Sequence, residues 1–213
     1  MPPRIPDSTP DHAATARTPA EPLPATRDRL LGAMTDALRT RGLHGIGLCE
    51  LLAHAGAPKG VLYHHFPGGK QELAIAAVRA NVERSAASLD RLAASGTPPV
   101  AALRGWMGAA LKQLEASGFE RGCPLASVAL ESTASDVALR QALAEAFATL
   151  RTRLAAVLAG GGIAPRRAAT LATLSVAAYE GALMQARVAG DRKPMADTVE
   201  ALLALIESEL EPT

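Results

Sequence analysis

Residues 56–70 of the chain read GAPKGVLYHHFPGGK. A glycine and a proline interrupt the chain at the start of this stretch, and the one or two helical turns that follow carry Lys59, Tyr63 and His64. Ammonium, hydroxyl and imidazole groups on one short helix suit a surface of phosphates and base edges. An apolar helical pattern over residues 48–55 precedes the turn. Together these segments predict a helix-turn-helix motif.

The composition favours an all-helical protein around this motif. Of the 213 residues, 48% are hydrophobic and only 3% are aromatic. Most of the apolar residues are Ala and Leu, which are strong helix formers, while β-branched residues are sparse. We therefore predict an all-α fold with a small helix-turn-helix domain and a larger helical bundle.

Glycine and proline positions divide the chain into about nine expected helices. Residues 1–25 are rich in Pro, Ala and Thr and are expected to form a disordered tail. Thr26 reads as the N-cap of the first helix, which ends at Gly42. The other helices are expected over residues 48–55, 58–65, 70–94, 100–117, 125–131, 139–157, 165–189 and 195–210. These elements predict one domain over residues 26–70 and a second over residues 71–213.

Charge is concentrated in the first of these domains. Residues 26–70 contain six Lys or Arg and three Asp or Glu, whereas residues 71–213 contain 14 basic and 15 acidic side chains. A small cationic domain on a nearly neutral body indicates a local surface for phosphates. The excess is modest and by itself is weak support for nucleic-acid binding.

Several kinds of site and location are not expected. Cys49, expected to be buried, and Cys123 do not lie in a metal-ligand spacing and are too few for a disulfide framework, which favours a reducing compartment such as the cytoplasm. The first residues lack the pattern of a secretory signal, and no apolar run of about 18 residues predicts a membrane span. Consecutive helical residues point about 100° apart, so His64 and His65 cannot chelate one ion. We expect no metal and no cofactor.

The segment from Ala55 to Phe66 resembles the signature of the TetR family of bacterial transcriptional repressors. The resemblance covers residues 26–73. Finer motifs resemble the subgroup that contains the lincomycin-resistance and flavonoid-responsive repressors: PKG at 58–60, FPGGKQEL at 66–73, GCPL at 122–125 and EGAL at 180–183.

The resemblance implies a homodimer that places the third helix of each protomer in a major groove of a pseudopalindromic operator. Leu62 and Phe66 match core positions of the trihelical unit. Ile46 departs from the family, because many members have Thr or Ser near this position to cap the second helix and touch a phosphate. The positions that match the DNA contacts are Thr26, Gly47, Lys59, Gly60, Val61, Tyr63, His64 and Lys70. The alternative is that Lys59 and Lys70 are ordinary solvated lysines on the surface.

The C-terminal region is implied to bind a small apolar effector that releases the DNA. Four of the six aromatic residues fall there, and an Ala-rich bundle leaves room for a ligand. A plain core is the alternative for each apolar candidate, and Cys123 is either a buried small residue or an oxidation sensor. Glu180 within an apolar helix is unexpected unless it has a partner. The candidates for the ligand site are Trp106, Met107, Phe119, Cys123, Leu125, Phe147, Tyr179, Glu180, Leu183 and Met184.

The sequence thus predicts a ligand-responsive transcriptional repressor rather than an enzyme. The Ala-rich eighth helix and the leucine stripe of the ninth are expected to pack across the two-fold axis of a homodimer. The fourth helix is expected to transmit the effector signal to the DNA. The alternatives are an all-α enzyme, which no motif supports, and a helical scaffold that binds a partner protein.

Overall fold

The computed structural model describes residues 25–210, and within this range every regular element is a helix. The all-α prediction is confirmed, and the nine helices of the described range lie close to the expected boundaries. The expected tail, residues 1–25, lies outside the described residues except for Ala25. The helices are α1 (Thr26–Thr40), α2 (Leu48–Ala55), α3 (Lys59–His65), α4 (Gly69–Ala94), α5 (Pro99–Ala116), α6 (Pro124–Glu131), α7 (Val137–Gly160), α8 (Pro165–Ala189) and α9 (Lys193–Ser208).

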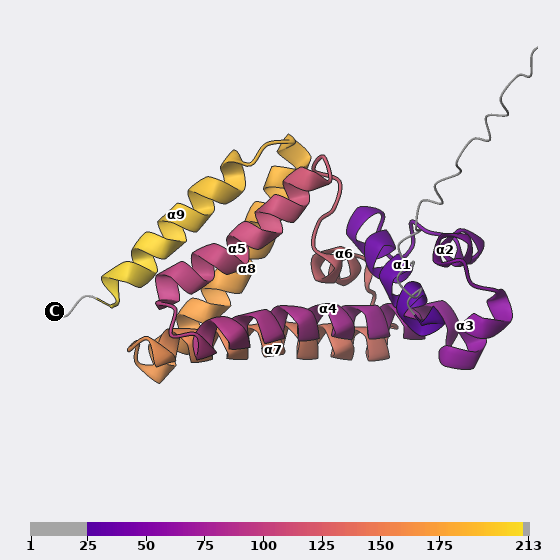
Figure 1. Cartoon of the computed structure of the whole chain (residues 1–213), viewed down its shortest axis with the longest axis horizontal. Helices are drawn as coiled ribbons and strands as arrows, with labels where there is room; N and C mark the ends of the chain where they lie inside the picture. The colour runs from indigo at the N-terminus through magenta and orange to yellow at the C-terminus, as the bar shows by residue number, and fades with distance from the viewer. Residues whose placement is uncertain (1–24, 211–213) are drawn as a thin grey trace, which may run out of the picture.

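Helices α1, α2 and α3 form a trihelical unit at one end of the molecule (Figure 1). Its core contains Leu30, Met34 and Leu38 of α1, which lie at 3–4 residue spacing and are fully buried. Leu62 and Phe66 are also buried, as their match to the family implied. This core fixes the outward-facing side of α3.

The turn between α2 and α3 depends on a glycine. Gly56 ends α2 with φ +57° and ψ +39°, the left-handed conformation that glycine adopts without steric cost. Arg29 of α1 reinforces this corner, because its Nε donates to the carbonyl of Ala55 at 3.1 Å. The angle between α2 and α3 is therefore held by the backbone and by α1.

Two expectations about this unit were wrong. The N-cap of α1 is Ala25, whose carbonyl accepts from the amides of Asp28 and Arg29, so Thr26 is the first helical residue. Cys49 is exposed, because the buried face of α2 is filled by Leu51, Leu52 and Ala55.

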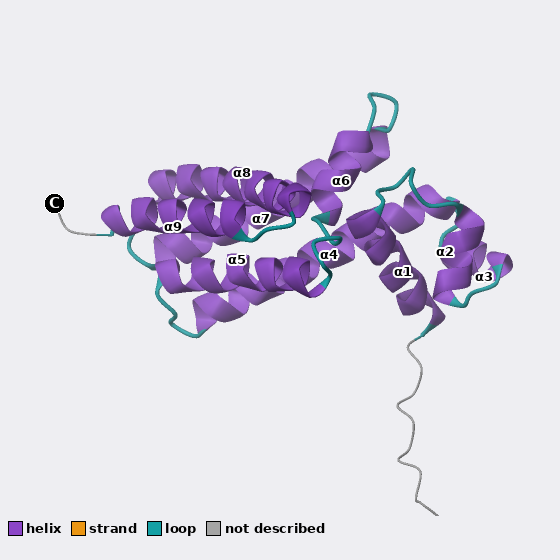
Figure 2. Cartoon of the chain, turned by 90° about the horizontal axis from the view of Figure 1, so that it is seen from above, coloured by secondary structure: helices purple, strands orange, loops and turns teal. Residues whose placement is uncertain are grey.

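The bundle, α4–α9, extends from the trihelical unit. Helices α4 and α7 run side by side, and α5 and α8 pack against them. Helix α9 packs on α5 and α8, and α6 lies between the bundle and α1 (Figures 1 and 2). The periodic leucines of α7 are buried, as the spacing predicts. On the outer side of the pair, Arg79 of α4 contacts Glu145 of α7 at 3.4 Å. Helix α4 therefore joins the two parts, since it packs on both α1 and α7.

Candidate nucleic-acid interface and effector cavity

The outward side of α3 presents four of the eight residues predicted to contact DNA. Lys59, Gly60, Tyr63 and His64 are all exposed, and Tyr63 retains 44% of its accessible surface. Val61 is half-buried. A short helix with exposed cation, hydroxyl and imidazole groups matches what a groove with phosphate edges requires.

Gly60 faces open space. A Cβ placed on it would meet no atom within 4 Å, and its φ is not positive. Neither packing nor backbone conformation in the protein therefore requires glycine there. A close approach by a molecule outside the chain would require it.

Lys70 lies beside the start of α2. Its Nζ donates to the carbonyl of Ile46 at 2.5 Å, and Gly47 is the N-cap of α2 without a side-chain cap bond. Partial burial lowers the pKa of Lys70, while the charge of Glu131 acts in the opposite direction. Ile46 itself is buried, so it supplies only its carbonyl to this corner. An ammonium fixed next to a helix N-terminus is a suitable environment for a phosphate.

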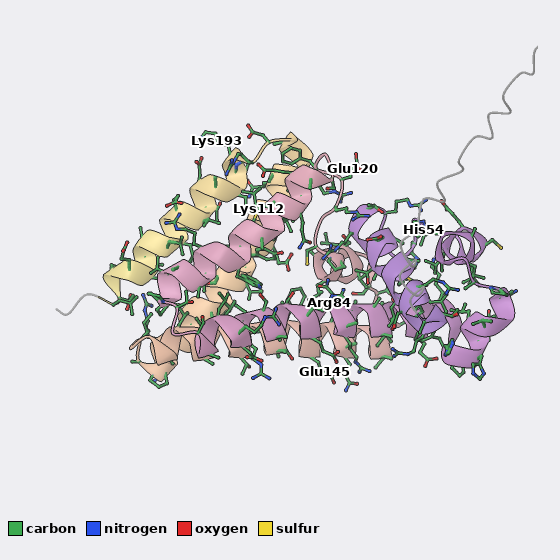
Figure 3. The ribbon with its side chains drawn as sticks, in the orientation of Figure 1. His54, Arg84, Lys112, Glu120, Glu145 and Lys193 are labelled. Carbon is green, nitrogen blue, oxygen red and sulfur yellow. The ribbon has the colours of Figure 1, made fainter. Side chains whose placement is uncertain are left out.

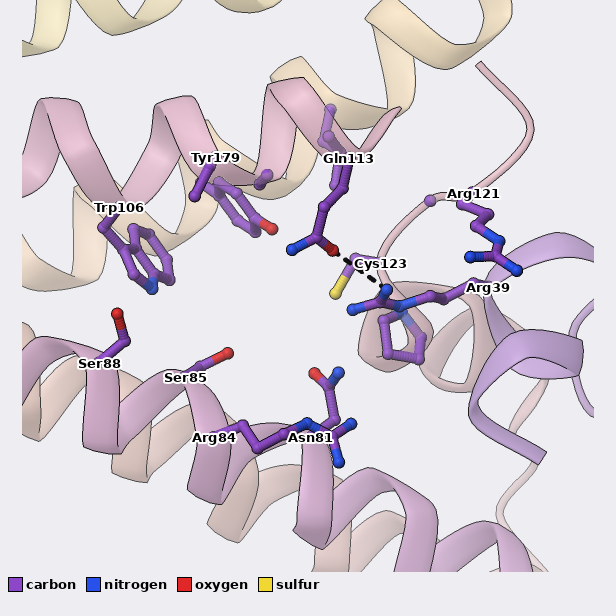
Figure 4. A pocket seen from close by; sticks show the side chains of 15 residues that line it. Arg39, Asn81, Arg84, Ser85, Ser88, Trp106, Gln113, Arg121, Cys123 and Tyr179 are labelled. Carbon is purple, nitrogen blue, oxygen red and sulfur yellow. Dashed lines mark hydrogen bonds between the residues drawn. The ribbon is translucent and has the colours of Figure 1, made fainter. Parts of the chain in front are cut away.

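Most of the other cations in the trihelical unit are engaged within the protein. Arg29 bonds to the end of α2, Arg41 pairs with Glu50 at 2.6 Å, and the guanidinium of Arg27 lies 5.6 Å from the Phe66 ring centroid. Arg39 points toward the bundle (Figure 4). The local excess of positive charge is therefore largely structural.

A set of hydrogen bonds connects the trihelical unit to the bundle. The carboxylate of Glu131 accepts from the amides of Leu43 at 2.6 Å and His44 at 3.1 Å. Arg187 of α8 donates to the carbonyl of Thr40 at 2.8 Å, and the amide of Gly122 donates to the carbonyl of Arg39 at 3.0 Å. The C-terminal end of α1 is thus held by α6, α8 and the loop that precedes α6.

A cavity of about 250 Å³ lies where these elements meet. Figure 4 shows side chains of α1, α4, α5 and α8 converging on it. Trp106 and Tyr179 lie at one end, with ring centroids 4.8 Å apart. The residues that line the cavity are Arg39, Asn81, Arg84, Ser85, Ser88, Trp106, Ala109, Ala110, Gln113, Arg121, Gly122, Cys123, Pro124, Tyr179 and Leu183.

The structure separates the predicted ligand-site residues into groups. Trp106, Cys123, Tyr179 and Leu183 line the cavity. The other apolar candidates do not: Met107 and Leu125 are buried in the core, Phe119 and Phe147 are half-buried, and Met184 is 49% exposed.

Glu180 was also predicted to belong to the ligand site, and its place in an apolar helix called for a hydrogen-bonding or charged partner. Cys123 Sγ donates to its Oε1 at 3.1 Å, and its Oε2 is buried without a hydrogen-bond partner. Burial raises the pKa of this carboxyl to about 7, and burial together with Glu180 raises the pKa of the Cys123 thiol well above its usual range. A thiol held in its protonated form is a poor nucleophile, which does not favour an oxidation sensor.

The sequence prediction missed the polar part of the lining. Asn81, Arg84, Ser85 and Ser88 follow one another at helical spacing along α4. This polar stripe beside the apolar face of α4 was a usable signal. Arg39 and Arg121 could not have been found in this way, because they reach the cavity from α1 and from a loop.

Residues 25–210 show neither a metal-binding cluster nor a membrane-spanning helix. Within residues 25–210, no group of three or more His, Cys, Asp or Glu side chains could hold a metal ion. No helix in that range is both long enough and apolar enough to cross a membrane.

Two protein families match this chain, one over each part of the molecule. Residues 30–77 match the family described as bacterial regulatory proteins, tetR family. Residues 99–201 match the family described as transcriptional regulator LmrA/YxaF-like, C-terminal domain. The subgroup expected from the short motifs is confirmed by the second match.

Individual proteins agree with these families. An uncharacterized HTH-type transcriptional regulator of Mycobacterium tuberculosis is 34% identical over 195 residues, which cover 86% of this chain and 95% of the relative. The HTH-type transcriptional regulator LmrA of Bacillus subtilis is 29% identical, with 80% of this chain and 90% of the relative covered. The crystal structure of regulatory protein TetR from Rhodobacter sphaeroides has a TM-score of 0.75 at 25% identity and covers 84% of this chain and 97% of its own.

Proposed function

This chain belongs to the TetR family of transcriptional regulators, in its LmrA/YxaF-like subgroup, and on that premise we propose that it is a repressor released from its operator by a small-molecule effector. The family consists of DNA-binding regulators. In this proposal the protein acts in the cytoplasm as a homodimer on a pseudopalindromic operator, and it has no catalytic activity.

The exposed side of α3 supports the proposed DNA contact. Lys59 and Gly60 stand at the start of the helix, where the N-terminal residues of a recognition helix approach base edges. Tyr63 and His64 follow one turn later on the exposed side. Lys70, in the first turn of α4 and beside the N-terminus of α2, supplies a phosphate contact in this arrangement. In this proposal phosphate contacts supply affinity and α3 supplies the sequence preference.

An apolar stripe on α8 supports the proposed dimer. Leu174 (44%), Met184 (49%) and Val188 (85%) are exposed on the helix, and the Cβ of a side chain at Gly181 would meet no atom within 4 Å. These positions are separated by three to seven residues and fall on one face with Ala177. Ala168, Ala172 and Ala182 are buried within the protomer and are not available for the partner. A self-complementary apolar face suits a two-fold interface.

The position of the cavity supports the proposed release mechanism. It is lined by Arg39 of α1 as well as by α4, α5 and α8, so its contents touch the trihelical unit directly. An effector changes operator affinity only if it prefers one arrangement of the two parts, and such coupling is typically about 1–3 kcal/mol. In this proposal the filled cavity favours a spacing of the two α3 helices that does not fit the operator.

The observation that carries this proposal is the exposed face of α3 in a chain of this family. It is tested by selecting fragments of the host genome on the purified protein and sequencing the bound pool. We expect enrichment of one pseudopalindromic sequence with half-sites about one helical turn apart. A bound pool with the composition of the input would overturn the proposal.

A further inference from the structure

The cavity lining carries a concentration of positive charge that an apolar effector does not explain. Arg39, Arg84 and Arg121 all line it, and no Asp or Glu is among the lining residues. The sequence prediction of a small apolar effector accounts for Trp106 and Leu183 but leaves these guanidinium groups without a role. Arg84 and Arg121 are exposed and Arg39 is half-buried, so these guanidinium groups are accessible to a ligand that enters the cavity.

The three arginines differ in how far their charge is already used. Arg121 contacts Asp36 at 3.3 Å, an exposed pair. Arg39 donates from Nη1 to the neutral amide oxygen of Gln113 at 3.1 Å, and its Nε is buried with no hydrogen-bond partner. Arg84 makes neither an ion pair nor a hydrogen bond within residues 25–210. Two cations thus remain without a carboxylate partner.

The carboxyl of Glu180 contacts the lining residue Cys123 but is not itself part of the lining. It accepts a hydrogen bond from the Cys123 thiol at 3.1 Å. Burial raises its pKa to about 7, so it is only partly ionised at neutral pH. It therefore does not offset the charge of both Arg39 and Arg84.

The two ends of the cavity have different chemistry. Figure 4 shows the rings of Trp106 and Tyr179 at one end and the guanidinium of Arg39 near Cys123 at the other. Arg84 projects from α4 on the side that faces α5 and α6 (Figure 3). The rings offer a flat apolar surface, and the guanidinium groups offer paired donors that fit a carboxylate.

We propose that the cavity binds a small anion with a flat apolar body, such as an aromatic carboxylate, with its anionic group against Arg39 and Arg84 and its ring against Trp106 and Tyr179. The proposal rests on the proposed function, since it names the chemical class of the effector. Because Arg39 belongs to α1, the anion would join the trihelical unit to the bundle directly.

The experiment uses the full chain and the fluorescence of Trp106, which is the only tryptophan in the sequence. Three matched probe pairs are titrated: benzoate and benzamide, cinnamate and cinnamamide, and 2-naphthoate and 2-naphthamide. A charge-assisted hydrogen bond is worth about 1.5–3 kcal/mol, so we expect at least one carboxylate to bind roughly ten- to a hundredfold more tightly than its amide.

Variants assign the preference to the arginines. Arg84→Gln removes a group with no protein partner and is expected to abolish the preference for the carboxylate without affecting folding. Arg39→Gln is the second variant, and circular dichroism establishes that each variant is folded. Arg140→Gln, at an exposed position on α7 away from the cavity, is the matched control and is expected to keep the preference.

Equal binding of carboxylate and amide in every pair overturns the proposal, as does the absence of saturable quenching by all six probes. A preference that survives Arg84→Gln, or one that Arg140→Gln also removes, overturns it as well. Operator binding is measured separately without any probe. A chain that selects an operator but shows no carboxylate preference retains the proposed function and loses this inference.

Discussion

The carboxylate of Glu131, at the end of α6, accepts the backbone amide of Leu43 at 2.6 Å, 88 positions earlier in the chain. The same oxygen accepts from the amide of His44. Gly42 permits this approach, because a Cβ at that position would lie 1.8 Å from Glu131 Oε1 and its φ is +76°. The loop before α2 is therefore fastened to the bundle by one side chain, next to the Ile46 carbonyl that holds Lys70.

Replacing Glu131 with Ala is expected to release this loop. The amides of Leu43 and His44 lose their acceptor, so their hydrogen exchange should accelerate while the cores of α4 and α7 keep their protection. Exchange measured by mass spectrometry on peptides covering residues 41–47 checks this. Glu120→Ala, at an exposed position outside the contact, is the control. Unchanged protection of the loop in Glu131→Ala would show that the contact does not hold it.

Lys59→Ala is expected to remove sequence preference. The side chain stands at the first position of α3, and a base-edge contact is worth about 1–3 kcal/mol of discrimination. Affinity for the selected fragment should fall toward the affinity for random DNA, as measured by fluorescence anisotropy. Lys112→Ala removes an exposed lysine of α5 and serves as the control (Figure 3). If both variants discriminate as well as the unmodified protein, α3 does not read the bases through Lys59.

Gly60→Ala separates folding from recognition. Gly60 and Gly32 both lie in helices, and a Cβ at either would meet no atom within 4 Å. Each substitution should therefore stabilise the fold, by up to about 1 kcal/mol. Only Gly60→Ala should also weaken operator binding, because its methyl group lies on the side of α3 that approaches the groove. Equal operator affinities for Gly60→Ala and Gly32→Ala would remove Gly60 from the interface.

The apolar stripe on α8 predicts that the mass of the particle in solution depends on Met184. Met184→Glu places a charge within the proposed interface, where burial is costly. The unmodified protein should sediment at twice the chain mass of 21.9 kDa, and the variant at or near that chain mass. Thr152→Glu introduces the same charge at an exposed site on α7 and should remain dimeric. A Met184→Glu dimer as stable as the Thr152→Glu dimer would place the interface elsewhere.

Glu180 predicts a component of stability that decreases with pH. Its pKa is about 7 in the folded protein and 4.5 in the reference state, so between these values the folded protein binds more protons than the unfolded chain. The contribution is therefore full below about pH 4.5 and is lost as pH rises to 7, at about 1.4 kcal/mol per pH unit and at most about 3 kcal/mol in all.

Glu180→Gln tests this sign. The variant cannot ionise, so its free energy of unfolding relative to the unmodified protein should rise between pH 5 and pH 8, as measured by urea denaturation. Gln185→Glu, at an exposed position of the same helix, is the control for a general effect of charge on α8. A difference between Glu180→Gln and the unmodified protein that is the same at both pH values would show that Glu180 titrates normally.

The sequence predicted the helices well because their breakers and periodicity are local. Gly56, Pro165 and the glycines at 160–162 mark ends that no tertiary contact has to specify. The outward side of α3 could also be predicted from the sequence, since the family resemblance and the apolar positions Leu62 and Phe66 fix which side is buried. The prediction of an N-cap at Thr26 was wrong because the actual N-cap is Ala25. Its carbonyl accepts the first helical hydrogen bonds, and its methyl side chain carries no capping signal in the sequence.

The cavity was predicted less well because it is assembled from distant segments. Aromatic and Met residues were chosen by type, which included Trp106 and Tyr179, which line the cavity, but also Met184, which is exposed on α8. Arg39 could not be found, because its position on α1 gave no indication that it reaches α5. Residue type alone does not specify which face of a helix turns inward when both faces are apolar.

The most direct test of the central claim is a competition between two duplexes for the purified, unmodified protein. The fragment enriched from the host genome is compared with a duplex of the same composition and shuffled sequence, at about 150 mM salt so that phosphate contacts alone bind weakly. Specific binding at least about 10³-fold tighter than the shuffled duplex is predicted. Equal displacement by the two duplexes would contradict the proposal that the exposed side of α3 reads DNA sequence.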